Sequence, residues 1–82
     1  MYSIGITKNA KNFLRQIPKR DAEIILKKLY SIKENPFPYL KKLKGNKLWR
    51  LRILKYRAIV DIIVSNKKIM VLRIGQRKNI YN

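Results

Sequence analysis

The chain has 82 residues, of which 21 are Lys or Arg and 4 are Asp or Glu, so its formal net charge is +17. This length favours one domain, and an apolar content of 46% is typical of a folded protein, which excludes a disordered basic tail. The chain contains no Cys and no His, which excludes disulfides, Cys-based zinc sites and the commonest general base, and we expect neither a metal nor a cofactor.

So large a positive charge indicates an anionic partner, because cations on a small folded domain repel one another. Nucleic acid is the partner that the composition favours, since Lys and Arg release condensed counterions when they meet phosphates. No long apolar segment or lipidation signal points to a membrane, and the start of the chain lacks the regions of a signal peptide. We therefore expect a cytoplasmic protein that binds nucleic acid, with an acidic protein partner remaining open.

The first half of the chain predicts a strand followed by two helices. Residues 2–6 alternate as in a short strand, and Thr7 is a favourable N-cap for a helix over 8–17. Pro18 breaks that helix and can open a second one over 18–34, which two further prolines end. The break predicts an antiparallel helical hairpin with one shared apolar side. Its buried stripe on the second helix comprises Ala22, Ile25, Leu26, Leu29 and Ile32.

The second half predicts a basic loop over 40–47 and then three strands. The strands cover 48–54, 56–64 and 68–74, and a hairpin turn separates the last two. In the last strand we expect Met70, Leu72 and Ile74 to face the core, and Ile69, Val71 and Arg73 to face outward. The fold class is α+β with the order β-α-α-β-β-β, in which the helical hairpin packs on one face of a mainly antiparallel four-stranded sheet.

Arginines alternate with core residues in these strands. Because successive side chains point to opposite faces, the arginines are expected on the face that the helices leave uncovered. A solvated face is the ordinary explanation in antiparallel sheets. The preference for Arg over Lys favours phosphate binding instead, since a planar guanidinium matches the geometry of a phosphate. The residues concerned are Arg50, Arg52, Arg57 and Arg73, and Asp61 is an acid on the same face that can pair with one of them.

Three segments carry a resemblance to a known family: the helical hairpin, LKGNKLWRLRILKYRAIV over 43–60, and IMVLRIGQRKNIY over 69–81. They contain Leu43 and Gly45, Arg50 and Arg52, Tyr56 and Arg57, then Gly75, Arg77 and Tyr81, in that order. In these elements the chain resembles the RelE/ParE superfamily of bacterial and archaeal toxins from toxin–antitoxin pairs. The resemblance covers nearly the whole chain and implies one RelE-like domain over 1–82, similar in fold to microbial ribonucleases.

The resemblance implies a ribosome-dependent endoribonuclease that cuts messenger RNA in the A site and so inhibits translation. In that reaction an RNA 2′-hydroxyl attacks the adjacent phosphate and expels a 5′-oxygen. By matching position, Arg57 and Arg77 would hold the phosphate, while Arg50 and Arg52 would stabilise charge or assist proton transfer. Tyr81 would stack on or orient a base, or assist proton transfer. The predicted substrate-binding residues are Lys44, Lys47, Lys55 and Arg73.

The proton acceptor for this reaction stays open. Arginine hardly deprotonates, because its pKa lies above ~12, and Gln76 stands where many relatives carry His. Tyr81, Lys47, Lys55 and water remain candidates, and none has an unperturbed pKa near ~7. Catalysis is therefore expected to be mostly electrostatic and positional, with the ribosome aligning the substrate. Free RNA should be cut weakly or not at all.

Two other functions remain open: a ParE-like toxin that inhibits DNA gyrase by binding, and a non-catalytic RNA-binding module. ParE-like members usually lack the set formed by Arg57, Arg77 and Tyr81, so this set favours the nuclease. An RNA-binding module usually carries exposed aromatic stacking platforms, and Trp49 is expected on the core face.

The resemblance also implies partners. These are a cognate acidic or amphipathic RelB-type antitoxin, bound in a heterotetramer or larger complex, and the ribosome with its messenger RNA. An antitoxin helix packed along the helical hairpin, or in the groove beside the sheet, would neutralise the basic surface. No membrane partner is expected.

Overall fold

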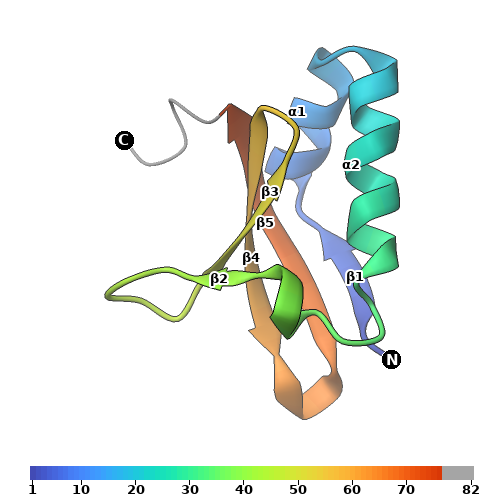
Figure 1. Cartoon of the computed structure of the whole chain (residues 1–82). Coiled ribbons are helices and arrows are strands. Elements are labelled where there is room, and N and C mark those ends of the chain that lie inside the picture. The colour runs from blue at the N-terminus through green and yellow to red at the C-terminus, as the bar shows by residue number, and fades with distance from the viewer. Residues whose placement is uncertain (77–82) are drawn as a thin grey trace.

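Two helices cover one face of a five-stranded sheet in the computed structural model, which describes residues 1–76 (Figure 1). The chain forms a strand, two helices and then four strands, so the α+β prediction is confirmed. The elements are β1 (Ser3–Ile6), α1 (Lys8–Gln16), α2 (Lys19–Ser31), the 3-10 turn η1 (Phe37–Tyr39), β2 (Lys41–Lys42), β3 (Trp49–Ile53), β4 (Tyr56–Ile63), the 3-10 turn η2 (Val64–Asn66) and β5 (Lys68–Gln76).

The strand order across the sheet is β1-β5-β4-β3-β2. β1 runs parallel to β5, and the other neighbouring pairs are antiparallel, as predicted for the greater part of the sheet. The prediction of four strands is one short, because Lys41 and Lys42 of the expected loop pair with Arg50 and Trp49 to form β2. Two residues are too few to show the alternation from which a strand is recognised.

Thr7 anchors the start of the helical layer. Its Oγ1 accepts a hydrogen bond from the Ala10 amide at 3.2 Å, which is the N-cap bond predicted for α1. The same hydroxyl donates to the carbonyl of Leu72 on β5 at 2.6 Å, and the Thr7 amide donates to the Val71 carbonyl at 3.1 Å. One side chain therefore both begins α1 and ties it to the sheet.

The apolar stripe of α2 forms the centre of the core. Ile25, Leu29 and Ile32 are 0% exposed, as predicted, whereas Ala22 and Leu26 are only partly buried. The stripe belongs to one cluster with inward residues of the sheet and with Ala10 of α1, which is also fully buried. The sheet residues in that cluster are Leu51, Ile53, Tyr56, Ala58, Val60, Ile69, Val71 and Ile74.

The inward face of β5 corrects the predicted alternation. Ile69 and Val71 are 0% exposed, and Met70 and Leu72 are partly exposed, the reverse of the prediction. The cause is a β-bulge: Val60 pairs with Val71 and Ile59 pairs with Arg73, so Leu72 is an extra residue. One extra residue inverts the alternation on one side of it. Beyond the bulge the prediction is confirmed, since Ile74 is buried and Arg73 faces outward.

Candidate functional site: an arginine-lined sheet face

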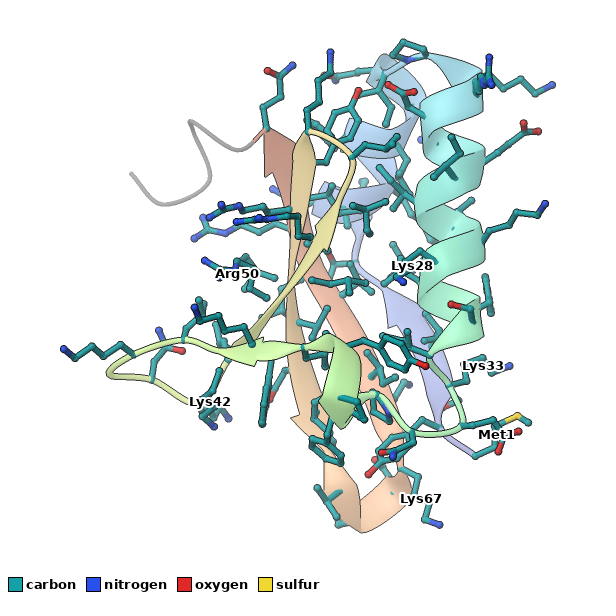
Figure 2. All side chains as sticks on the ribbon, viewed as in Figure 1. Met1, Lys28, Lys33, Lys42, Arg50 and Lys67 are labelled. Carbon is teal, nitrogen blue, oxygen red and sulfur yellow. The ribbon has the colours of Figure 1, made fainter. Side chains whose placement is uncertain are left out.

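Four arginines share the sheet face that the helices leave uncovered. Arg52 lies directly opposite Arg57, while Arg50 lies opposite Ile59, which is itself opposite Arg73. Residues opposite one another in an antiparallel pair point to the same face, with Cβ atoms about 4.5–5.5 Å apart. The arginines therefore occupy two adjacent rows across β3, β4 and β5. Figure 2 shows Arg50 projecting from the sheet on the side away from the helices.

The row that contains Arg57 has a largely buried cation at its centre. Arg57 is only 8% exposed, so its cation is partly removed from water. Its cross-strand neighbours are Arg52 on one side and Gly75, which has no side chain, on the other. Like charges placed opposite each other, and a desolvated cation, both raise the free energy of the folded state.

The second row has an apolar centre between two cations. Ile59 is 3% exposed although no helix covers this face. Its neighbours in the row are Arg50, which is half-buried, and Arg73, which is exposed. Arginine stems are long and aliphatic, so neighbours of this kind can cover an apolar side chain. The arginine face, defined here as Arg50, Arg52, Arg57 and Arg73, thus combines an apolar floor with four guanidinium groups.

The predicted lysines lie around this face rather than within it. Lys44 is exposed in the loop between β2 and β3. Lys47, in the same loop, pairs with Asp61 at 3.8 Å, so the ion pair of Asp61 is made to a lysine. Lys55 lies in the β3–β4 turn with its Nζ 5.7 Å from the ring centre of Tyr56, which faces the helices. Arg77 and Tyr81, two further predicted site residues, lie outside the described residues.

A buried tyrosine, named in the sequence only as part of the family pattern, joins the strand that carries Arg57 to the second helix. Tyr56 is 1% exposed, and its hydroxyl donates to Asp21 Oδ2 at 2.7 Å. Phe13 of α1 packs edge-to-face on the Tyr56 ring with 5.8 Å between ring centres. The hydrogen bond raises the pKa of Tyr56 above its usual 10.0, and burial and the charge of Asp21 raise it further. This contact ties the start of β4 to both helices.

Replacing Tyr56 by Phe should change how stability depends on alkaline pH. Because folding raises the pKa of Tyr56, its hydrogen bond stabilises the fold fully below the unfolded pKa of about 10. The stabilisation is lost as pH rises through the higher folded pKa. In denaturant unfolding at about pH 8, the free energy of unfolding should be higher for wild type than for Tyr56→Phe. The difference in free energy between the two proteins should shrink at about pH 11.

Tyr39→Phe is the matched control, because Tyr39 is 54% exposed and lies on η1. Its stability relative to wild type should not change over the same pH range. A difference between wild type and Tyr56→Phe that stays constant to about pH 11 would contradict the role given to the Tyr56 hydroxyl.

The aromatic residues near η1 pack on one another rather than form an open platform. Phe37 contacts Tyr2 and Trp49 edge-to-face, with ring centres 6.2 and 5.5 Å apart. The Nζ of Lys42 lies 4.9 Å from the ring centre of Trp49. Trp49 packs against the core, as predicted, so it does not offer a free face for stacking a base.

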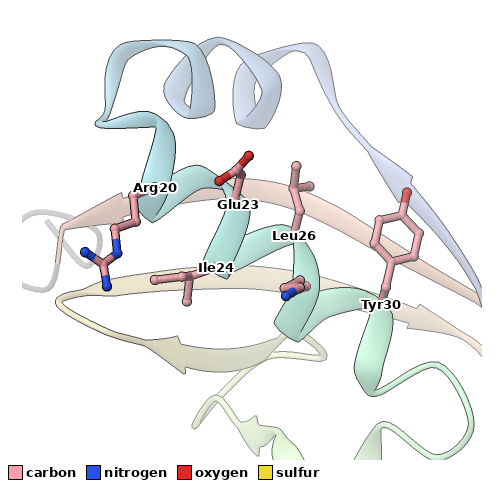
Figure 3. Close-up of a pocket in the computed structure, with 6 residues that line it drawn as sticks. Arg20, Glu23, Ile24, Leu26 and Tyr30 are labelled. Carbon is pink, nitrogen blue, oxygen red and sulfur yellow. The ribbon is translucent and has the colours of Figure 1, made fainter.

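The outward side of α2 carries an open hollow of about 570 Å³. Figure 3 shows side chains that line it, with Arg20 near the start of the helix and Tyr30 near its end. Sequence reasoning placed Leu26 in the buried stripe and overlooked this side, although Ile24 and Tyr30 fall outside the stripe and signal a second apolar surface. The lining residues are Arg20, Glu23, Ile24, Leu26, Lys27 and Tyr30.

Two classes of site receive no support from the described part of the chain. Between residues 1 and 76, no group of three or more acidic side chains is placed to hold a metal ion. Over the same residues, no helix has the length and apolar character needed to cross a membrane.

Comparison with known proteins identifies the family. The model of the ParE toxin of type II toxin–antitoxin systems matches residues 4–81. No curated protein sequence matches significantly. Among solved structures, the archaeal RelE–RelB complex from Pyrococcus horikoshii OT3 has a chain 26% identical, with a TM-score of 0.83 over 95% of this chain and 97% of that one.

Two further structures share the fold at lower identity. The toxin–antitoxin complex RelBE2 from Mycobacterium tuberculosis matches with a TM-score of 0.85 and 20% identity, over 93% of this chain and 98% of that one. The isolated E. coli RelE toxin matches with a TM-score of 0.81 and 22% identity, over 99% of this chain and 92% of that one. With the family match over residues 4–81, these likenesses show that the chain is a type II toxin of the RelE/ParE superfamily.

Proposed function

We propose that this toxin is a ribosome-dependent endoribonuclease that cuts messenger RNA in the A site. The observation that carries the proposal is the arginine face, whose four guanidinium groups occupy adjacent rows on the uncovered side of the sheet. The likeness to RelE toxins, which reaches 26% identity for the chain from Pyrococcus horikoshii OT3, supports the same choice.

The proposed reaction transfers a phosphodiester within the RNA. The 2′-oxygen forms a bond to the adjacent phosphorus, and the bond from phosphorus to the 5′-oxygen breaks. The 2′-hydroxyl loses its proton to a base, and the 5′-oxygen gains one. Arg52 and Arg57 are opposite one another and would bind the non-bridging oxygens, where negative charge grows in the transition state. Because Arg57 is 8% exposed, its donors act where water screens little.

Dependence on the ribosome follows from the chemistry of the side chains. Arginine is always charged and cannot accept the proton of the 2′-hydroxyl. The chain has no His, and Lys47 is engaged with Asp61. Tyr81, Lys55, Lys47 and water therefore remain the candidate proton acceptors, none with a pKa that suits the task unperturbed. Alignment of the messenger by the ribosome would supply what a strong base supplies elsewhere.

We also propose that an acidic or amphipathic antitoxin helix binds the hollow on α2. The hollow combines three apolar side chains, Ile24, Leu26 and Tyr30, with two basic ones and one acidic one, which are Arg20, Lys27 and Glu23. Such a surface suits a helix with one apolar face and acidic flanks. The chain from Pyrococcus horikoshii OT3 was solved as a RelE–RelB complex, which supports an antitoxin as the partner.

A ParE-like action on DNA gyrase is the second candidate, because the family model that matches is that of ParE toxins. Inducing the toxin in cells and mapping messenger 5′ ends separates the two. The nuclease predicts new ends within translated codons that disappear in the Arg52→Gln, Arg57→Gln double variant. Intact messengers together with altered plasmid supercoiling and growth arrest would instead support gyrase as the target.

A further inference from the structure

Helix α1 carries a second cationic surface, which is separate from the arginine face. Lys8, Lys11 and Arg15 follow the spacing i, i+3, i+7 and share one side of the helix, and all three are exposed. We call these three residues the α1 face. Within residues 1–76 the ion pair given by the structure joins Lys47 to Asp61, so no carboxylate in that part of the chain neutralises the α1 face.

Three cations of the helical layer, Lys8, Lys19 and Arg20, lie in the first turns of the helices, where they cost stability, whereas Arg15 lies in the last turn of α1, where a cation is favourable. The N-terminus of a helix carries partial positive charge, so cations are unfavourable there. α1 has no acidic residue in its first turn and begins with Lys8. α2 begins with Lys19 and Arg20, and its first-turn acid, Asp21, accepts the hydrogen bond of Tyr56. Local choices that work against folding are expected where function requires them.

The α1 face and the arginine face cannot hold the same phosphodiester. The helices cover one side of the sheet, and Arg50 projects from the other (Figures 1 and 2). The register of the strands places the other residues of the arginine face on the same side as Arg50. The side of α1 opposite its cations carries the buried Ala10, which belongs to the core between the two layers. A messenger strand gripped by the arginine face therefore leaves the α1 face available for a second polyanion.

We infer that the α1 face binds the phosphate backbone of a folded RNA, distinct from the strand on the arginine face. Lys8 and Arg15 are about 10 Å apart along the helix axis, which is the reach of two or three successive phosphates. The absence of aromatic residues among the cations fits a duplex, which is recognised by shape and phosphates, rather than a single strand. The inference rests on the proposed function in one respect: ribosomal RNA is the folded RNA that the toxin would meet.

The test compares two variants that each lose three positive charges. The first is Lys8→Gln, Lys11→Gln, Arg15→Gln, and the second is Lys28→Gln, Lys33→Gln, Lys67→Gln, at positions labelled in Figure 2 that lie elsewhere on the molecule. Affinity is measured for an RNA duplex of about 20 base pairs and for ribosomes that carry a messenger with a 2′-deoxy nucleotide at the A-site cut. The deoxy nucleotide prevents cleavage, so binding alone is read.

The α1 variant should bind both probes at least about 10-fold more weakly, and its slope of log affinity against log salt should fall by about 2–3. The control variant should stay within about 3-fold of wild type. The α1 variant should unfold at about the same temperature as wild type, because it loses Lys8 from the first turn of α1, where a cation is unfavourable, and Arg15 from the last turn, where a cation is favourable.

Equal weakening in both variants would show an effect of net charge alone and overturn the inference. Unchanged duplex binding by the α1 variant would overturn it too, even if the ribosome-dependent cleavage persists. If wild type binds the duplex through the α1 face but ignores the programmed ribosome, the inference stands and the proposed function fails. The two claims therefore fail through different measurements.

Discussion

Replacing Arg57 by Gln should lower ribosome-dependent messenger cleavage by about 10²–10³-fold, the loss typical when one preorganised donor to a developing oxyanion is removed. Arg57 is the buried cation of the arginine face and lies opposite Arg52. Gln is polar and uncharged but shorter than Arg, so it loses the phosphate contact while placing no new charge in the buried position. The rate is measured in single turnover on purified ribosomes with the A-site codon exposed.

Two further variants define what the Arg57 result means. Arg57→Lys keeps the charge but loses the planar fork, so we expect an intermediate rate. Lys33→Gln is the control, because it removes one positive charge away from the arginine face. The Nζ of Lys33 lies 5.3 Å from the ring centre of the exposed Tyr30. This variant should cut the messenger at the wild-type rate. Wild-type cleavage by a folded Arg57→Gln protein would show that the buried guanidinium does not touch the reacting phosphate.

Leu29→Ala should lower the free energy of unfolding by about 2–5 kcal/mol, as for other fully buried leucines. Leu29 is 0% exposed at the centre of the α2 stripe, and the truncation would leave a cavity between the helix and the sheet. Small domains are stable by only about 5–15 kcal/mol in total, so the truncation should remove a large part of the stability of this one. Denaturant unfolding with matched slopes gives the difference.

Leu54→Ala is the matched control, because it is the same truncation at an exposed position instead of a buried one. Leu54 is 54% exposed in the β3–β4 turn, so the same truncation there should change the free energy of unfolding by less than about 0.5 kcal/mol. Similar losses in Leu29→Ala and Leu54→Ala would mean that α2 does not form the core described here.

Periodicity alone predicted the features that depend on the direction of side chains. The alternation of Arg50 and Arg52 with Leu51 and Ile53 follows from strand geometry, and the register with β4 bears it out. The stripe of Ile25, Leu29 and Ile32 is equally local. In both cases the residue type and its spacing determine the face, whichever element packs against it.

The features that the sequence did not reveal depend on contacts between distant residues. The β-bulge at Leu72 inverts half of β5, and nothing in the alternation of that segment announces it. The bond from Tyr56 to Asp21 joins residues 35 positions apart. β2 exists only because Lys41 and Lys42 lie beside β3. Each of these arises from tertiary packing rather than from local pattern.

Part of the candidate site follows from the sequence and part does not. A shared face for the four arginines could be predicted, because alternate side chains of a strand point to the same side. Their arrangement in two rows could not, since it depends on the register between strands. The directions of Lys47 and Lys55 could not, since a loop and a turn have no periodicity. The hollow on α2 was missed because one apolar stripe was taken to account for all the apolar residues of the helix.

The most direct test of the arginine face is cleavage of an A-site messenger by purified toxin, with the products resolved at their ends. Wild type should cut a messenger of ordinary RNA, and a single 2′-deoxy nucleotide on the 5′ side of the cut should abolish cleavage. The Arg52→Gln, Arg57→Gln protein should leave both messengers intact while remaining folded. Cleavage that tolerates the deoxy nucleotide, or that persists in the double variant, would contradict attack by the 2′-hydroxyl on a phosphate held by these arginines.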